Sequence, residues 1–394
     1  MTDWNAMTDA EFRKEVRQFF EAEYPEELRH LPHRPKFAEI EHWHRKLHAK
    51  GWVAPAWPAE FGGMGLNAAK LLIFYEEQQR WGVNRGRDMG VQMVGPLIIK
   101  FGTQEQKDYW LPRILSCEDI WCQGYSETTA GSDLAQLQMK AIDDGDEFIC
   151  TGHKIWTTHA HEANWMFGLV RTDGSGKPQQ GITFLLIDMT APGVRVEPII
   201  MSSGEHIQNT VYFDEVRVPK SNIVGAVGAG WGVAKYLLEF ERGGTAYGPK
   251  LLARLDGLRR AARELGADIA PQLARAEIAC RALEAAELRL MAELSHGGTP
   301  GLKASMMKVR GTELSQHLTE LGLEIAATYS HPFQPQHTAP GGPVAGIALR
   351  NDMPVGPEIG LTAAAKYLND RAGSIYAGSN EIQRNILAKA QLGL

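Results

Sequence analysis

The sequence predicts an α+β protein of three parts: an N-terminal α-helical domain (1–119), a middle β-barrel or sandwich domain (120–227) and a C-terminal four-helix bundle (228–394). Three observations support this division. A chain of 394 residues is too long for a single hydrophobic core. Its apolar residues follow a helical period up to about position 115, and short β-type runs replace that period from about position 120. The helical period returns after Gly230 and continues to the C-terminus.

The first helix is predicted to begin at Thr8, because Thr8 and Glu11 have the spacing of a capping box. Apolar residues then follow at helical spacing, at Phe12, Val16, Phe19 and Phe20. A segment rich in Pro and Gly, residues 54–65, interrupts the helices that follow.

Turn-forming clusters separate five β-type runs in the middle of the chain. The runs are Glu147 to Thr151, Trp165 to Arg171, Thr183 to Asp188, Val194 to Ile199, and Thr210 to Val218. The acidic cluster Asp143 to Asp146 is too short for a calcium loop, so we expect a hairpin turn there. The Gly-rich stretch 225–232 is predicted to be the hinge between the β domain and the bundle.

Composition excludes several classes of partner. A net charge of −6 argues against nucleic acid, because phosphate binding needs a concentrated basic face. No apolar run reaches membrane-spanning length, so we expect no membrane association and a soluble, cytoplasmic protein with reduced thiols at its four cysteines. We expect no metal site either. His42, His44 and His48 share a helix, but a solvated helix face explains them better than a ligand set.

Three segments carry the functional signal: Tyr-Ser-Glu-Thr-Thr-Ala-Gly-Ser-Asp-Leu at 125–134, Gly-His-Lys-Ile-Trp-Thr-Thr at 152–158, and Tyr-Ala-Gly-Ser-Asn-Glu-Ile-Gln-Arg-Asn-Ile-Leu-Ala at 376–388. Further matches are Phe-Gly-Thr-Gln-Glu-Gln-Lys at 101–107 and Phe-Asp-Glu-Val-Arg-Val-Pro at 213–219. In this order and spacing they resemble the acyl-CoA dehydrogenase flavoprotein family across nearly the whole chain. The resemblance implies an FAD-dependent oxidoreductase that converts an acyl-CoA thioester to a trans-2-enoyl-CoA.

The resemblance also implies which residues meet the cofactor. Trp156 would lie against the flavin ring, and Thr158 would lie near flavin N5, where a donor stabilises the reduced ring. The loop of small polar residues would contact the pyrimidine and the pyrophosphate. It differs from the family pattern at Thr128 and Thr129, where family members usually have Pro-Gly. The predicted cofactor-binding residues are Tyr125, Ser126, Ser132, Trp156, Thr157, Thr158, Ser379 and Glu381.

The catalytic base cannot occupy the usual family position, because that position is Ala377 in this chain. A family subgroup carries its base on the first helix of the C-terminal bundle. That helix here holds Glu239 and Glu241, which lie roughly 200° apart around the helix axis. Glu241 follows Ala234 and Leu237 on the apolar stripe, and burial would raise its pKa toward the range of a general base. We therefore predict Glu241 as the base; an internal salt bridge is the alternative role.

Four residues are predicted to bind the substrate. In the family, the backbone N–H at the position of Ala377 polarises the thioester carbonyl, and Gly378 allows close approach of the acyl chain. Arg242 would orient the base or contact the CoA, and Ser132 lies where bound CoA passes. The Gly243–Gly244 pair resembles that of members acting on steroid-side-chain CoA esters, so a bulky branched, cyclic or steroid-derived acyl group is the hypothesis.

Assembly is predicted from two sequence differences. Homotetrameric family members use an Arg-x-x-Phe-Gly turn and a Gln-x-x-Gly-Gly turn to hold the adenine half of a neighbour's FAD. The counterparts here, Arg263-Glu-Leu-Gly and Thr319-Glu-Leu-Gly, match neither. The chain is therefore not expected to supply adenine-side contacts to a partner, although it could accept them from a different subunit. We expect a homo-oligomer or a heterotetramer with a second acyl-CoA dehydrogenase-like subunit, and electron transfer to an electron-transfer flavoprotein. An acyl-CoA oxidase, a nitroalkane-oxidase-like enzyme and a non-catalytic or half-site subunit are the alternatives.

Overall fold

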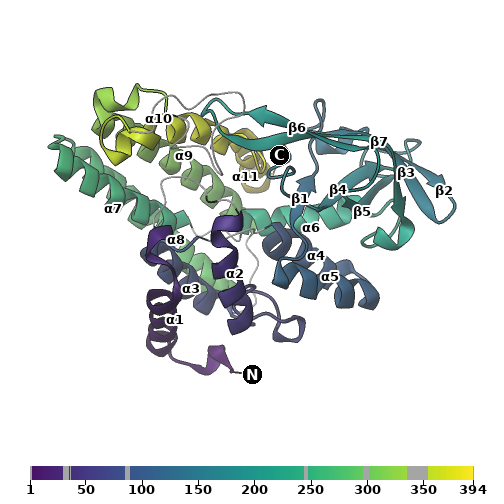
Figure 1. Cartoon of the computed structure of the whole chain (residues 1–394), viewed down its shortest axis with the longest axis horizontal. Helices are drawn as coiled ribbons and strands as arrows, with labels where there is room; N and C mark the ends of the chain where they lie inside the picture. The colour runs from purple at the N-terminus through teal and green to yellow at the C-terminus, as the bar shows by residue number, and fades with distance from the viewer. Residues whose placement is uncertain are drawn as a thin grey trace.

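The structure is a computed structural model of the whole chain. It describes residues 2–29, 35, 37–84, 89–243, 247–295, 301–334 and 354–393, without the side chains of 238–243 and 294–295. Helices at the N-terminus, one curled sheet and a C-terminal group of helices follow one another along the chain and lie side by side in space (Figure 1). The predicted fold class is thereby confirmed, whereas the domain boundaries at 119/120 and 227/228 stay a prediction.

The N-terminal part contains five α-helices and one π-helical segment within its described residues. They are α1 (Asp9–Glu23), α2 (Phe37–Lys50), α3 (Ala68–Trp81), η4 (Met89–Val94), α4 (Gly95–Phe101) and α5 (Gln104–Ser116). The predicted capping box at the start of α1 is present, because the Thr8 hydroxyl accepts the Glu11 N–H and the Glu11 carboxylate accepts the Thr8 N–H. A second capping box joins Thr103 and Gln106 at the start of α5.

The middle part is one curled seven-stranded sheet. Its strands are β1 (Trp121–Gly124), β2 (Lys140–Asp144), β3 (Glu147–Lys154), β4 (Trp165–Arg171), β5 (Ile182–Asp188), β6 (Val194–Ile200) and β7 (His206–Pro219). Their order is β1-β4-β2-β3-β7-β6, and β5 pairs with β4. The β1–β4 and β2–β4 pairs are parallel, and the other pairs are antiparallel.

All five predicted β-type runs are strands, and two strands were missed. β1 has only four residues, and β2 is mostly exposed and polar, so neither shows the apolar pattern that marks a strand. The predicted hairpin turn joins β2 to β3, where Gly145 takes a left-handed conformation (φ 70°).

The C-terminal part is a helical bundle. It comprises α6 (Gly230–Gly243), α7 (Tyr247–Leu265), α8 (Ala270–Ser295), α9 (Gly301–Ala326), α10 (Glu358–Asp370), the 3-10 segment η9 (Arg371–Ser374) and α11 (Asn380–Leu392). α9 contacts α6, α7, α8, α10 and α11, and α3 packs against α7 and α8. α6 joins the sheet to the bundle, because it packs against β5 and α4 as well as against α9 (Figure 1).

One prediction for the N-terminal helices was wrong. His44 does not lie on a solvated helix face: it is buried, and its Nε2 lies 2.9 Å from the carbonyl oxygen of Leu115 on α5. Burial also lowers the pKa of His44. Among the described residues, no helix has both the length and the apolar character that a membrane span requires.

Candidate active site

Two of the three predicted motifs meet in the sheet. The carbonyl oxygen of Ser126 accepts a hydrogen bond from the Ile155 N–H at 2.9 Å. The Lys154 Nζ donates to the carbonyl oxygen of Tyr125 at 3.3 Å, and Thr128 Oγ1 lies 3.1 Å from His153 Nε2. The loop that begins at Tyr125 is therefore fastened to the end of β3, immediately before Trp156.

A buried ion pair lies beneath this junction. Lys154 Nζ is 2.8 Å from Glu127 Oε1, and the Glu127 carboxylate also accepts the backbone N–H groups of Gln138 (2.6 Å) and Met139 (3.0 Å). Burial lowers the pKa of Lys154, and the Glu127 charge opposes that effect. Sequence reasoning missed both residues, since neither was expected to touch cofactor or substrate.

The loop itself is a tight turn that does not need the family's glycine. Glu127 and Ala130 exchange two backbone hydrogen bonds of 3.1 Å around Thr128 and Thr129. Neither threonine has a positive φ, so the difference from the family pattern introduces no backbone strain. Ser132, further along the loop, is exposed.

Of the predicted cofactor residues, Tyr125 and Thr157 point inward. The Tyr125 ring is buried and lies edge-on to Phe167 and Phe184. Thr157 is fully buried on the next segment. Contacts from these two residues to a surface-bound cofactor would therefore come from the backbone.

Trp156 is exposed, whereas Thr158 is half-buried. Trp156 has a left-handed conformation (φ 59°), and the residue is 55% exposed. Strand β7 holds the residues that follow, because the Thr157 N–H donates to the Asn209 carbonyl at 3.0 Å and Asn209 Nδ2 donates to the Thr157 carbonyl at 3.0 Å. The Thr158 hydroxyl pairs with the side-chain amide of Gln208, 3.1 Å from its Oε1.

The third motif forms a tight turn into α11. Ala377 and Gly378 are both left-handed, with φ of 54° and 77°, and Ser379 then caps the helix by accepting the Ile382 N–H. The left-handed φ of Gly378 favours glycine, and a Cβ there would also displace the side-chain amide of Gln383, whose Nε2 would lie 2.5 Å away. Ala377 is exposed, and its N–H has no acceptor among the described residues.

Buried hydrogen bonds to α9 fix the first residue of α11, Asn380. Asn380 is buried, and its Oδ1 accepts hydrogen bonds from Lys308 Nζ (2.9 Å) and Thr312 Oγ1 (3.2 Å), both on α9. Burial lowers the pKa of Lys308 to about 8. Asn380 is thus a structural anchor, while Glu381 beside it is exposed in the first turn of α11.

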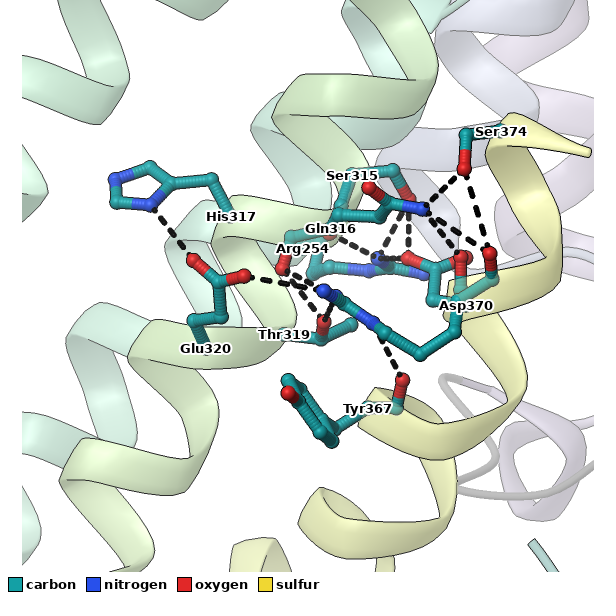
Figure 2. A network of polar contacts seen from close by, with 10 residues as sticks. Arg254, Ser315, Gln316, His317, Thr319, Glu320, Tyr367, Asp370 and Ser374 are labelled. Atoms are coloured by element: carbon teal, nitrogen blue, oxygen red, sulfur yellow. Dashed lines mark hydrogen bonds and ion pairs between the residues drawn. The ribbon is translucent and has the colours of Figure 1, made fainter. Parts of the chain in front are cut away.

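A polar network holds the segment before the turn (Figure 2). Arg371 donates to Glu320 Oε1 (3.1 Å), to the Gln316 carbonyl (3.2 Å) and to Thr319 Oγ1 (3.1 Å). Gln316 Nε2 in turn donates to the Asp370 carbonyl at 3.0 Å and to Ser374 Oγ at 3.1 Å. These contacts fasten η9 to α9, so both sides of the Ala377 turn are tied to the same helix.

The predicted base lies on the helix that joins the sheet to the bundle. Ala234 and Leu237 of α6 are fully buried, and Lys235 is exposed, as the predicted apolar stripe requires. Glu241 is the next position along the row of Ala234 and Leu237, four residues beyond Leu237. The side chains of Glu239, Glu241 and Arg242 lie outside the described residues, so their roles stay predictions.

The chemistry of these groups fits a flavin. Trp156 offers an exposed aromatic plane, and Thr158 and Ser132 offer hydroxyls on the linked loop and strand. Two buried polar atoms of the second and third motifs, Thr157 Oγ1 and Gln383 Oε1, have no hydrogen-bond partner within the described parts of the chain.

Family comparison agrees with this arrangement over most of the chain. The family models described as the acyl-CoA dehydrogenase N-terminal, middle and C-terminal domains match residues 7–118, 122–216 and 228–392. The chain therefore belongs to the acyl-CoA dehydrogenase family, whose members are flavoprotein oxidoreductases.

Individual relatives resemble the chain along nearly its full length. It is 36% identical to the acyl-CoA dehydrogenase IpdE1 of Mycobacterium tuberculosis over 91% of this chain and 89% of the relative. Among solved structures, the Tcur3481-Tcur3483 steroid ACAD has 27% identity and a TM-score of 0.82, covering 98% of this chain and 97% of that one. The ChsE4-ChsE5 complex of M. tuberculosis has 29% identity and a TM-score of 0.79, covering 99% and 98%.

One counterpart of the family's adenine-binding turns, the segment from Thr319 to Gly322, lies within a helix. Thr319 and Gly322 are buried inside α9, where the Thr319 hydroxyl donates to the Gln316 carbonyl at 2.6 Å. Arg263 lies in the last turn of α7. The segment around Thr319 is therefore part of a packed helix, and the Thr319 hydroxyl accepts a hydrogen bond from Arg371.

Proposed function

We propose that this chain carries out the FAD-dependent α,β-dehydrogenation of an acyl-CoA thioester, with a trans-2-enoyl-CoA as the product. The observation that supports it most is the turn at Ala377. Ala377 is exposed, its backbone N–H has no acceptor among the described residues, and both flanks of the turn are tied to α9. A fixed N–H of this kind suits a developing oxyanion.

In the proposed mechanism, the Ala377 N–H donates to the thioester carbonyl and so increases the acidity of the α-hydrogen. Glu241 removes that hydrogen as a proton, as its place on the apolar row of α6 allows. The residues around Trp156 and Thr158 would hold FAD, which would supply the acceptor for the β-hydrogen as hydride, so that two-electron oxidation of the substrate would balance two-electron reduction of the cofactor. Trp156 would cover one face of the ring system, and Thr158 would supply a hydroxyl near the accepting atom.

A bulky acyl group is the proposed substrate class. The Gly243–Gly244 pair follows the proposed base, and one structural relative is a steroid ACAD. A heteromeric assembly is proposed on similar grounds: another relative is a complex of two proteins, ChsE4 and ChsE5, and the Thr319 segment here is a packed helix. Electrons would leave to an electron-transfer flavoprotein.

The decisive experiment is an anaerobic titration of the flavin-loaded protein with straight-chain, branched and steroid-side-chain CoA esters. We expect bleaching of the oxidised flavin absorbance, fastest with the bulky esters. Faster reduction by butyryl- or octanoyl-CoA would contradict the substrate class. Glu241→Gln should retain bound FAD and lose bleaching by at least about 1,000-fold, the scale of a lost general base. Glu239→Gln is the matched control on the same helix, and unchanged bleaching by Glu241→Gln would place the base elsewhere.

The second candidate is a half-site subunit, which supplies only part of the FAD site and needs a partner subunit to complete it. The helical Thr319 segment favours this candidate. In that case the chain purified alone would bind no stoichiometric FAD, and a partner subunit would restore binding. If the chain alone is yellow and substrate-bleachable, this candidate fails. Peroxide formation in air, compared with dye reduction, tests the oxidase alternative in the same preparation.

A further inference from the structure

The turn that follows Thr158 gathers side chains that the proposed dehydrogenation does not use. His159 Nδ1 lies 3.3 Å from Glu162 Oε2, and His161 Nε2 lies 3.9 Å from the same oxygen. All three potential ligand atoms fall within 4.8 Å of one another. Ligands at about 2.0–2.1 Å from a tetrahedral ion stand roughly 3.4 Å apart, so small side-chain movements would bring these atoms onto one ion. We propose that His159, His161 and Glu162 bind a divalent transition-metal ion.

The backbone already holds this turn in shape. His159 has a left-handed conformation (φ 57°), and its N–H donates to the Ile207 carbonyl of β7 at 2.8 Å. The Glu162 N–H donates to the His159 carbonyl at 3.0 Å, which brings the carboxylate back over the first imidazole. The ligands therefore come from one short, preorganised segment, and binding need not order a flexible loop.

A buried amide supports the second imidazole from behind. Asn209 is fully buried, and its Oδ1 and Nδ2 lie 3.3 and 3.1 Å from His161 Nδ1. In the tautomer that carries its hydrogen on Nδ1, His161 donates to the Asn209 Oδ1, and its Nε2 is left to act as the ligand atom. His206 stacks on His161 with ring centroids 4.0 Å apart, and its own Nε2 lies 2.8 Å from the same Asn209 oxygen. Such outer partners orient histidine ligands in metal sites.

The donor set determines which ions suit the site. Two imidazole nitrogens and one carboxylate favour Zn²⁺, Co²⁺ or Ni²⁺, whereas Mg²⁺ and Ca²⁺ prefer oxygen ligands. Three protein ligands leave a coordination position open to water or to an exogenous group. Asn209 also holds Thr157, so a bound ion would stiffen the segment that carries Trp156 and Thr158.

Metal titration of the full-length, chelator-treated protein tests this proposal. Calorimetry with Zn²⁺ should show one ion per chain, and Co²⁺ should give the absorption bands of a four- or five-coordinate site. His161→Ala and Glu162→Gln should each weaken Zn²⁺ binding by at least about tenfold. Mg²⁺ and Ca²⁺ should not compete.

The matched control is His317→Ala, because His317 and Glu320 on α9 form an exposed i, i+3 pair with 3.5 Å between their atoms and no second imidazole. Zn²⁺ affinity should be unchanged in this variant. The proposal is overturned if the native chain binds no Zn²⁺, if Glu162→Gln binds as tightly as the native chain, or if His317→Ala weakens binding equally. Glu162→Gln preserves side-chain volume, so it still tests the proposal if His161→Ala fails to fold.

Discussion

Lys154 and Glu127 form an ion pair of 2.8 Å in which the two side chains are only 1% and 4% exposed. The pair joins the end of β3 to the loop that begins at Tyr125, and these are the two segments predicted to receive the flavin. This charged contact beneath the surface thus adds to the backbone hydrogen bond between Ser126 and Ile155 in holding the two motifs together.

Removing one member of this pair should destabilise the protein strongly. Glu127→Gln or Lys154→Met leaves an uncompensated buried charge, for which the cost is about 3–5 kcal/mol in the free energy of unfolding. Urea denaturation measures it, and the flavin content of the purified variant should fall in parallel.

The control for this prediction lies on the same sheet. Lys220 and Asp143 form an exposed pair of 2.7 Å, and Lys220→Met should cost no more than about 1 kcal/mol. If Lys154→Met and Lys220→Met lower the free energy of unfolding equally, the buried pair stabilises the protein no more than the exposed pair does.

Arg371 should matter for catalysis although it lies away from the reacting atoms. Its guanidinium holds η9 to α9, and the Ala372 carbonyl in η9 accepts the N–H groups of Ile375 and Tyr376 just before Ala377. Arg371→Lys cannot keep all of these directed contacts. We expect kcat/KM for an acyl-CoA ester to fall about tenfold, which corresponds to roughly 1.4 kcal/mol.

Arg310→Lys provides the comparison for Arg371, because the one ion pair of Arg310 within the described residues is an exposed i, i+3 pair with Glu313 on the same helix. Its kcat/KM should equal that of the native protein. If Arg371→Lys also leaves kcat/KM unchanged, the network stabilises the bundle without positioning the turn.

The parts of the fold that could be predicted from sequence are those with a strong local signal. β4 and β5 are continuous apolar runs with buried centres, and the Thr8 capping box depends only on residues three positions apart. β2 could not be predicted, because Lys140, Asp143 and Asp144 face solvent and its pairing with β3 and β4 supplies its order.

Some features of the candidate site could also be predicted from sequence, and others could not. Motif spacing predicted that 125–134 and 152–158 are functional, but not that Ser126 and Ile155 would be hydrogen-bonded, since β pairing is a long-range property. Nothing local identifies Lys308 or Asn209 as anchors; each acquires its partner only on folding. His44 was wrongly assigned to a solvated face because helix periodicity does not show which neighbouring element covers a polar residue.

Glu287 should make stability depend on pH. Its carboxyl group on α8 is buried and accepts the N–H groups of Tyr247 (2.6 Å) and Gly248 (2.7 Å), and burial raises its pKa to about 7 from 4.5. The folded state then binds more protons than the unfolded state between these values. The protonated carboxyl group therefore contributes roughly 3 kcal/mol to the free energy of unfolding. This contribution is fully present below about pH 4.5 and is lost as the pH rises through 7.

To test this pH dependence, the free energy of unfolding is measured from pH 4.5 to 8 in the native protein and in Glu287→Gln. The variant has no proton to lose, so its decline over this range should be smaller by roughly that amount. Glu293→Gln is the control: Glu293, also on α8, pairs at the surface with Lys303, and the native slope should persist. An unchanged slope in Glu287→Gln would contradict the prediction.

Replacing Ala377 should stabilise the protein, because this residue has an unfavourable backbone conformation. Its N–H is the proposed donor to the thioester carbonyl. At φ 54° its Cβ is strained, at a cost of roughly 1–2 kcal/mol that glycine avoids, although glycine loses more entropy on folding. Ala377→Gly should therefore raise the free energy of unfolding by about 0.5–1 kcal/mol and, since the N–H remains, keep turnover of the acyl-CoA ester. Ala372→Gly, in η9 with an ordinary φ, should instead lower stability by about 0.5–1 kcal/mol. If both variants lose stability equally in urea denaturation, the left-handed conformation of Ala377 does not persist in solution, and the proposed donor to the thioester loses its fixed direction.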